Sequence, residues 1–252
     1  MAFETERRVY TGTRPMDQAE FDAGLRAHML RVYNYMASGL ALTGIFAVVI
    51  AQMSIVTNDA GQIVGLTQLG QTLFGSPLKW VVMLAPLGLV FFLSARLHAM
   101  KQSTAQAVFW IYAALMGVSL ATIFMVFTGT SIARVFFITA GTFAGMSLWG
   151  YTTKKDLSGW GSFLFMGLIG IIIASIVNIF IGSTALQFAV SVIGVLVFVG
   201  LTAYDTQNIK NEYAEHLDHE SQGKLAISGA LRLYLDFINL FIMLMHLFGD
   251  RR

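Results

Sequence analysis

Apolar runs alternate with short polar segments along the chain after residue 31. Seven runs stand out, at 32–53, 80–96, 105–127, 132–151, 160–181, 187–204 and 225–248. The hydrocarbon layer of a bilayer is about 30 Å thick, and a helix of about 20 residues spans it. The runs are continuous, whereas strands of a membrane β-barrel alternate in segments of about ten residues. The pattern therefore predicts an all-α polytopic membrane protein with seven transmembrane helices.

Breaks between the runs carry glycine, proline or polar residues. Residues 157–204 contain no charge and are too long for one helix, so we place a break at Gly182, Ser183 and Thr184. The segment 58–79 is interpreted as an exposed loop with a short interfacial helix. Pro86 lies inside the second run, where it removes a backbone hydrogen bond and favours a kink.

The N-terminal part is polar, and we divide the chain into a tail at 1–31 and a seven-helix domain at 32–252. The tail has no apolar signal-peptide core, so we expect the first run to act as the insertion signal. Residues 17–31 form either a helix on the membrane surface or a solvated lead-in helix. One face of that segment would carry Phe21, Leu25, His28 and Met29.

Lysine and arginine predict the orientation. Five lie in the tail and six in the loops after the second, fourth and sixth runs, against two, Lys79 and Arg134, on the other side. We therefore expect a cytoplasmic N-terminus. A seventh full span places Arg251 and Arg252 outside, against the rule, whereas a re-entrant hairpin keeps them inside. No turn sequence interrupts 237–248, which favours a spanning helix.

Composition narrows the function classes. Hydrophobic residues make up 56% of the 252 positions and charged residues 12%, and no cysteine is present. The lack of cysteine excludes disulfide and thiolate chemistry. We find no nucleophile motif, no nucleotide loop and no nucleic-acid-binding face, so we expect neither an enzyme nor a cofactor. The expected partners are the lipid bilayer, permeant ions and another membrane protein.

Two aspartates are the candidate chemistry. Asp205 ends the sixth run and Asp236 lies near the middle of the seventh, where an unpaired carboxylate costs several kcal/mol, from about 3 upward. At about 1.5 Å per residue the two reach a similar depth if their helices are adjacent. Close carboxylates cannot both ionise easily and share a proton. Deprotonated, Asp205 and Asp236 would offer oxygen ligands to Ca²⁺.

Other interpretations of these residues remain open. Asp205 can cap a helix end, and Asp236 can pair with Arg232, four residues earlier. Arg96 either extends to water or turns inward to a carboxylate. Asn239 is a further polar group near Asp236. His216 and His219, together with Asp218 and Glu220, form either a metal-binding group or, as we favour, part of a solvated charged loop.

Glycine is abundant, with 24 residues. Gly141 and Gly145 are spaced as a small-residue pair, and so are Gly167 and Gly170. We expect helices to approach closely at these two pairs.

Three stretches resemble one family. Residues 232–241 (RLYLDFINLF) closely resemble the C-terminal signature of the Bax inhibitor-1 family. Residues 203–210 (AYDTQNIK) are similar to its sixth-helix motif, and 154–158 (KKDLS) to its basic loop. The hydrophobic layout agrees from about residue 26 to residue 250.

The resemblance implies a seven-helix fold whose last helix is enclosed by the others. It also implies a pH-sensitive Ca²⁺ leak gated by an aspartate pair, which Asp205 and Asp236 match. Arg96 resembles the second-helix arginine that latches the closed state by pairing with the first aspartate. Two departures stand out. Ala85 and Pro86 occupy the region where some members carry an acid. Arg232 stands where many members have a small polar residue, and its permanent positive charge disfavours cation passage.

Two hypotheses of function follow. The first is a pH-sensitive calcium leak channel. The second is a non-channel regulator that binds another membrane protein, such as a protease or a death-pathway factor. The basic inner loops fit a bacterial inner membrane.

Overall fold

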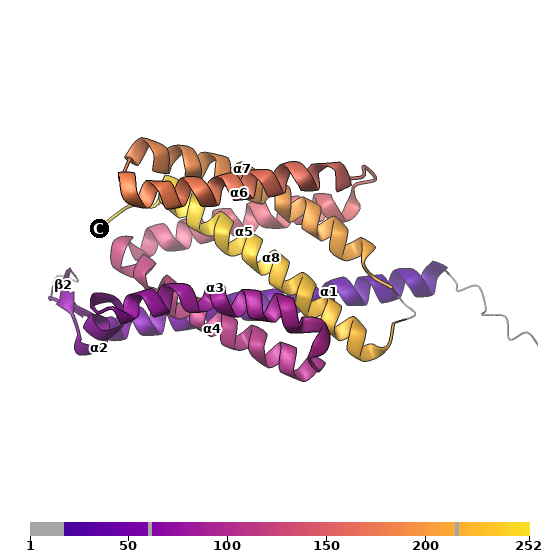
Figure 1. Ribbon diagram of the computed structural model, residues 1–252, viewed down its shortest axis with the longest axis horizontal. Helices are drawn as coiled ribbons and strands as arrows, with labels where there is room; N and C mark the ends of the chain where they lie inside the picture. Colours follow the sequence, from indigo (N-terminus) through magenta and orange to yellow (C-terminus); the bar gives the residue numbers. More distant parts are fainter. Residues whose placement is uncertain (1–17, 60–61, 215–216) are drawn as a thin grey trace, which may run out of the picture.

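The computed structural model describes residues 18–59, 62–214 and 217–252. In this part of the chain seven helices are long and apolar enough to cross a membrane (Figure 1). They are α1 (Gln18–Ser54), α3 (Leu78–Arg96), α4 (Gln102–Val126), α5 (Gly129–Thr152), α6 (Ser158–Ile181), α7 (Thr184–Asn211) and α8 (His219–Phe248). Seven predicted runs thus correspond to seven helices, and the all-α polytopic class is confirmed.

The end of the bundle at which α1, α4, α6 and α8 begin is called here the N-side, and the opposite end the C-side. Figure 1 shows the chain terminus, marked C, at the opposite end from the start of α1. The basic loops after α3, α5 and α7 lie on the N-side, whereas Lys79 and Arg134 lie near the C-side ends of α3 and α5.

The first helix differs from the expectation. α1 has no break at residue 31, where we expected the tail to end, and it begins already at Gln18. Leu25, His28 and Met29 are buried, and the ring centroids of Phe21 and His28 both lie 5.5 Å from that of Tyr213. The face predicted to meet lipid or water packs instead on the segment that follows α7. The tail at 1–17 lies outside the described residues.

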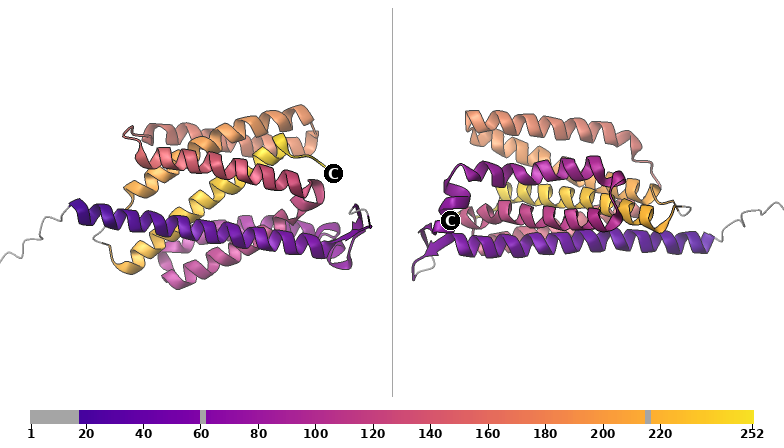
Figure 2. Two further views of the ribbon diagram at one scale, coloured as in Figure 1. Left: turned by 180° about the vertical axis from the view of Figure 1, so that it is seen from behind. Right: turned by 60° about the horizontal axis from the view of Figure 1, so that its bottom comes forward.

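α8 lies in the middle of the bundle. It runs obliquely between a group formed by α1, α3 and α4 and a group formed by α5, α6 and α7 (Figures 1 and 2). Its main neighbours are α1, α4, α5 and α7. In its most apolar window 56% of the residues are buried, against 11 to 33% in the other spans. The predicted central position of the last helix is therefore confirmed.

Pro86 shows why a proline is tolerated inside α3. Proline lacks the N–H that would bond the carbonyl four residues earlier, so the carbonyl of Val82 is freed. The hydroxyl of Ser119 on α4 donates to that carbonyl at 2.5 Å. A neighbouring helix thus satisfies a backbone group that lipid would leave unpaired.

The connections contain one predicted and one unpredicted feature. α6 ends where Gly182 takes φ +66°, a left-handed conformation that favours glycine, and Ser183 caps α7 by accepting from the N–H of Leu186. The segment expected to be a loop with a short helix also contains a hairpin. The hairpin consists of β1 (Ile55–Thr57) and β2 (Ile63–Leu66), and it is followed by α2 (Gln68–Gly70) and the π-helical turn η1 (Gln71–Gly75). In the next connection, the 3₁₀ turn η2 (Leu97–Ala99) follows α3.

The expected glycine contacts are mostly wrong. A side chain at Gly141, Gly145 or Gly170 would meet open space, and only Gly167 abuts another helix, at Val197. The close approach lies elsewhere: any side chain at Gly150 would collide with the backbone of Ala203. This contact brings α5 directly against the part of α7 that precedes Asp205.

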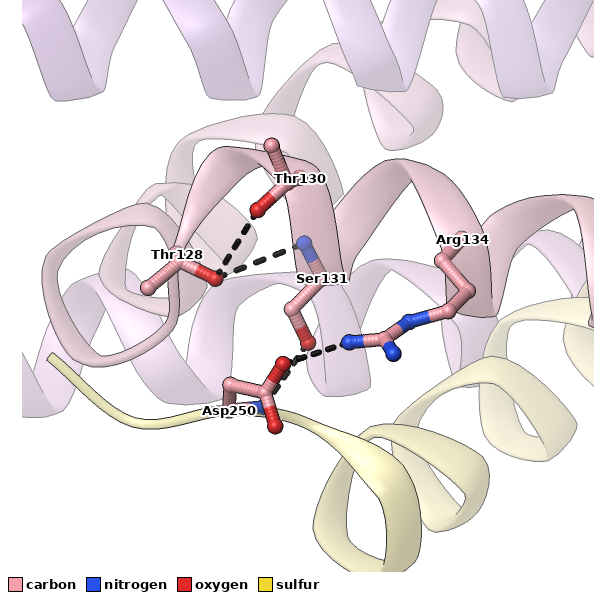
Figure 3. A network of polar contacts seen from close by, with 5 residues as sticks. All are labelled: Thr128, Thr130, Ser131, Arg134 and Asp250. Carbon is pink, nitrogen blue, oxygen red and sulfur yellow. Dashed lines mark hydrogen bonds and ion pairs between the residues drawn. The ribbon is translucent and has the colours of Figure 1, made fainter.

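The C-terminus is fastened to the turn between α4 and α5 (Figure 3). The N–H of Thr128 donates to the carbonyl of Asp250 at 3.0 Å, and the N–H of Asp250 donates to the Ser131 hydroxyl at 2.8 Å. The N–H of Arg252 donates to the carbonyl of Val126 at 3.0 Å, and Arg134 forms an ion pair with Asp250. α8 therefore runs from the N-side to the C-side as one helix, as a spanning segment does.

Candidate functional site

Asp205 and Asp236 meet between α7 and α8. Their carboxyl groups lie close enough to interact electrostatically. Two carboxylates have only acceptor atoms, so a hydrogen bond between them would need a proton on one of them. α7 continues past Asp205 to Asn211, which places Asp205 inside the helix and excludes a role as a helix-end cap. The fold thus brings two acidic groups together between neighbouring helices.

Burial differs between the two partners. Asp236 is only 4% exposed, and its Oδ2 atom has no hydrogen-bond partner in the described structure. Asp205 is half-buried. The pair therefore combines one carboxyl that is nearly sealed from solvent with one that is more accessible.

The pair lines a cavity of about 510 Å³ between α6, α7 and α8. Polar side chains in its wall are Tyr204, Asp205, Arg232, Asp236, Asn239 and Ser162. The apolar part of the wall includes Phe165, Leu168 and Phe198. Four of the five residues singled out from the sequence are thus gathered in one cavity.

Arg232 lies next to the pair but bonds another acid. Its guanidinium forms a fork with the carboxylate of Glu212, with Nη1 to Oε1 at 3.0 Å and Nη2 to Oε2 as the second contact. Arg232 also interacts electrostatically with Asp205 and Asp236. The local ion pair between Arg232 and Asp236 that the sequence left open is not the one formed.

Glu212 is the residue that sequence reasoning missed. It follows α7 and stands seven residues, two helical turns, after Asp205. That spacing places both acids on the same face of the helix. Counted with one shared proton, the pair contributes one negative charge, Glu212 another, and Arg232 one positive charge, so the group carries one net negative charge.

Arg96 and Asn239 take other positions. Arg96 is the exposed last residue of α3 and forms no ion pair with any residue that the structure describes. The latch to Asp205 is therefore absent from this conformation. The side-chain amide of Asn239 donates to the carbonyl of Leu235 at 2.9 Å, which leaves its side-chain oxygen toward the cavity wall.

The histidine loop gives no metal cluster among the residues described. His216 lies outside them, and no group of three or more His, Cys, Asp or Glu side chains gathers within them. Asp218 instead caps α8 by accepting from the N–H groups of Glu220 and Ser221. Hydrogen bonds from Ser221 lower the pKa of the Asp218 carboxyl below its ordinary value.

A chain of hydroxyl groups from α1, α5 and α7 leads to the residue that follows Asp205. The Tyr33 hydroxyl on α1 bonds the Ser147 hydroxyl on α5 at 2.7 Å, and Ser147 bonds Thr206 on α7 at 2.9 Å. Thr206 directly follows Asp205. The residues come from three helices far apart in the sequence, so no sequence pattern could have indicated them.

Comparison with known proteins gives a consistent result. A family model described as "Inhibitor of apoptosis-promoting Bax1" matches residues 25–252. The inner membrane protein YbhL of Escherichia coli K12 is 46% identical over 233 residues, covering 91% of this chain and 94% of the relative. The uncharacterized protein RP147 of Rickettsia prowazekii is 47% identical over 232 residues, covering 92% and 93%. An uncharacterized Caulobacter vibrioides protein is 45% identical over 253 residues, covering 97% and 98%.

The family model covers both aspartates, the α7–α8 interface and the central last helix. Its match extends over nearly all of the described chain, and the relatives match along almost their whole length. The chain therefore belongs to the Bax inhibitor-1 family of multi-pass integral membrane proteins.

Proposed function

We propose that the protein is a proton-sensitive leak channel for Ca²⁺, gated by Asp205 and Asp236. The observation that carries the proposal is the juxtaposition of the two carboxyl groups in the wall of one cavity, which Arg232 and Asn239 also line. Ionisable groups within a membrane protein mark ion pathways and proton relays.

The gate works by charge. With one shared proton the carboxyl groups attract each other and hold α7 against α8. Loss of that proton leaves two adjacent negative charges, which repel each other and attract a divalent cation. Ca²⁺ takes six to eight oxygen ligands, so Asp205 and Asp236 supply some of them and water the remainder. A few kcal/mol of differential interaction suffices to shift such an equilibrium.

Glu212 offsets the positive charge of Arg232, which would otherwise repel a cation near the pair. A free guanidinium beside the pair would repel a cation. The fork with Glu212 neutralises that charge and orients it toward the end of α7. In this scheme Arg232 and Glu212 set the pH at which the pair opens. Arg96 stays exposed here, so the closed state does not depend on it in this conformation.

The proposed orientation and location are supported by loop charge and by the relatives. The basic loops after α3, α5 and α7 support a cytoplasmic N-side under the positive-inside rule. YbhL is described as an inner membrane protein, which supports the same location for this chain. The proposed activity needs no catalytic group and no cofactor.

A regulator that binds another membrane protein is the second candidate. The observation in its favour is Arg232, a permanent cation in the wall of the same cavity. In that case the aspartate pair only stabilises the contact between α7 and α8. Asp205→Asn and Asp236→Asn would then leave partner binding intact, with no ion flux to lose.

The test is Ca²⁺ uptake into proteoliposomes between about pH 6 and pH 8, the range in which the proposal places the loss of the shared proton. We expect wild-type flux to rise with pH, and Asp205→Asn and Asp236→Asn each to flatten the profile because one titrating group is lost. Asp218→Asn is the matched control, since it removes a carboxylate from the α8 cap outside the cavity. No flux above empty liposomes at any pH would rule out the channel and favour the regulator.

A further inference from the structure

A second cavity does not touch the aspartates. It is a groove of about 690 Å³ between α1 and α5, and it is floored by α8. Buried side chains form the floor, among them Met36, Phe143 and Phe237. The rims are exposed and come from Arg26 and Leu30 on α1 and from Ala144 and Leu148 on α5.

The groove runs along the helices. α1 contributes Arg26 to Met36 and α5 contributes Ala140 to Tyr151 in the opposite direction, so Arg26 lies level with Tyr151 at the N-side. Ten residues of helix correspond to about 15 Å. Figure 2, left, shows α1 and α5 side by side with α8 passing behind them. Both walls belong to membrane spans, so the open side of the groove faces hydrocarbon.

The polar groups inside the groove are already satisfied. The Tyr33 and Ser147 hydroxyls bond each other at 2.7 Å, and Ser147 also bonds Thr206. The groove therefore offers an apolar surface below its mouth.

The mouth is basic. Arg26 forms no ion pair within the described residues, and Tyr151 is the penultimate residue of α5. Lys210 donates to the carbonyl of Tyr151 at 2.8 Å, and its ammonium group lies 5.2 Å from the centre of the Tyr151 ring. Around this end the cations are Arg26, Lys154, Lys155 and Lys210. The nearby acids in sequence are Asp22, Asp156 and Glu212, and Glu212 is paired with Arg232.

We propose that this groove binds one anionic phospholipid, with an acyl chain along the floor and the phosphate on Arg26. The geometry matches a lipid at both ends, because an apolar channel about 15 Å long leads to a guanidinium at the level where headgroups lie. Arginine is well suited to the phosphate because its planar fork donates two parallel hydrogen bonds.

A helix of another protein or of a second copy fits less well. Arg26 at the exposed rim forms no ion pair with the residues that the structure describes, and it calls for an anion, which a phosphate supplies and an apolar helix does not.

The experiment is native mass spectrometry of the detergent-solubilised protein, titrated with phosphatidylglycerol or with phosphatidylcholine of identical acyl chains. We expect a 1:1 complex in which phosphatidylglycerol binds about tenfold more tightly, because the choline ammonium of phosphatidylcholine offsets the charge of the phosphate that both lipids carry and is repelled by the guanidinium. Arg26→Gln should bring phosphatidylglycerol down to the level of phosphatidylcholine. Ala144→Phe, which fills the groove, should weaken binding of both lipids.

Two matched controls separate the groove from general effects. Arg31→Gln removes a charge from another face of α1, and Ala133→Phe adds the same ring at an exposed position of α5 outside the groove. Both should bind lipid like the wild type. Equal affinity of the wild type for the two lipids would overturn the proposal, as would unchanged binding in Ala144→Phe. A dimer that Ala144→Phe abolishes would assign the groove to a second copy instead. Neither lipid readout depends on ion flux.

Discussion

Asp236 occupies an unfavourable position. It is 4% exposed in the middle of a spanning helix, and a lone carboxylate there is unfavourable by several kcal/mol, from about 3 upward. The neighbouring Asp205 carboxyl offers a way to lower that cost, because two close carboxyl groups can share a proton. Arg232 and Glu212 form the second charged unit of the site. The apolar surroundings of α8 indicated from the sequence that Asp236 needed a partner, but Glu212 became visible only in the folded chain.

The charge of Arg232 can be tested directly. Arg232→Gln removes the positive charge beside the pair, which otherwise stabilises its deprotonated form. We expect the midpoint of the flux profile to move to higher pH by about one unit, since one pH unit corresponds to about 1.4 kcal/mol of interaction. Arg232→Lys keeps the charge and should move the midpoint less. A midpoint that stays in place in both variants would mean that Arg232 does not act on the pair.

The helices and turns follow local rules, with α3 as the instructive case. Its run of apolar residues predicts a span and Pro86 predicts a weak point. The repair comes from α4, because the Ser119 hydroxyl donates to the freed carbonyl of Val82. The sequence contains both residues, but only packing of α3 on α4 brings them together.

This repair predicts a coupling between two positions. Ser119→Ala should lower the free energy of unfolding by about 1 kcal/mol, because the Val82 carbonyl loses its partner within the membrane. In the Pro86→Ala background the same substitution should cost little, since alanine restores a backbone N–H at position 86 that can bond this carbonyl. A double-mutant cycle from unfolding in micelles measures the difference. Equal effects of Ser119→Ala in both backgrounds would contradict the account.

On the scale of the whole molecule, α8 joins two groups of helices. Arg232, near its middle, bonds Glu212 at the end of α7, and its C-side end is fastened to the turn between α4 and α5 (Figure 3). The last residues 249–252 bond the backbone of Val126 and Thr128 and the hydroxyl of Ser131. Any separation of α7 from α8 at the aspartate pair therefore takes place with the far end of α8 held.

We expect the C-terminal contacts to stabilise the fold mainly through the backbone hydrogen bonds of residues 249–252. Arg134→Ala should change the free energy of unfolding by less than about 1 kcal/mol, because an exposed ion pair contributes little. The side chains of Arg134 and Asp250 are 57% and 66% exposed. Deleting 249–252 removes the ion pair and four further hydrogen bonds between elements, three from the backbone of this segment and one from the Arg252 side chain. Each contributes about 1 kcal/mol, so the deletion should destabilise clearly more. Hydrogen exchange of the last turn of α8 reports the same loss locally. Equal effects of the two changes would show that the ion pair is the main contact.

The sequence by itself determined the class, the number of spans and most of their ends, because a bilayer demands long apolar helices and glycine or proline marks their breaks. It also singled out Asp205 and Asp236, since a charge within an apolar run is costly wherever the chain folds. Tertiary structure alone decided the fork between Arg232 and Glu212, the exposed position of Arg96, the close contact at Gly150 and the groove between α1 and α5. These depend on which helix faces which, and residue spacing within one helix carries no information about the identity or rotation of its neighbour.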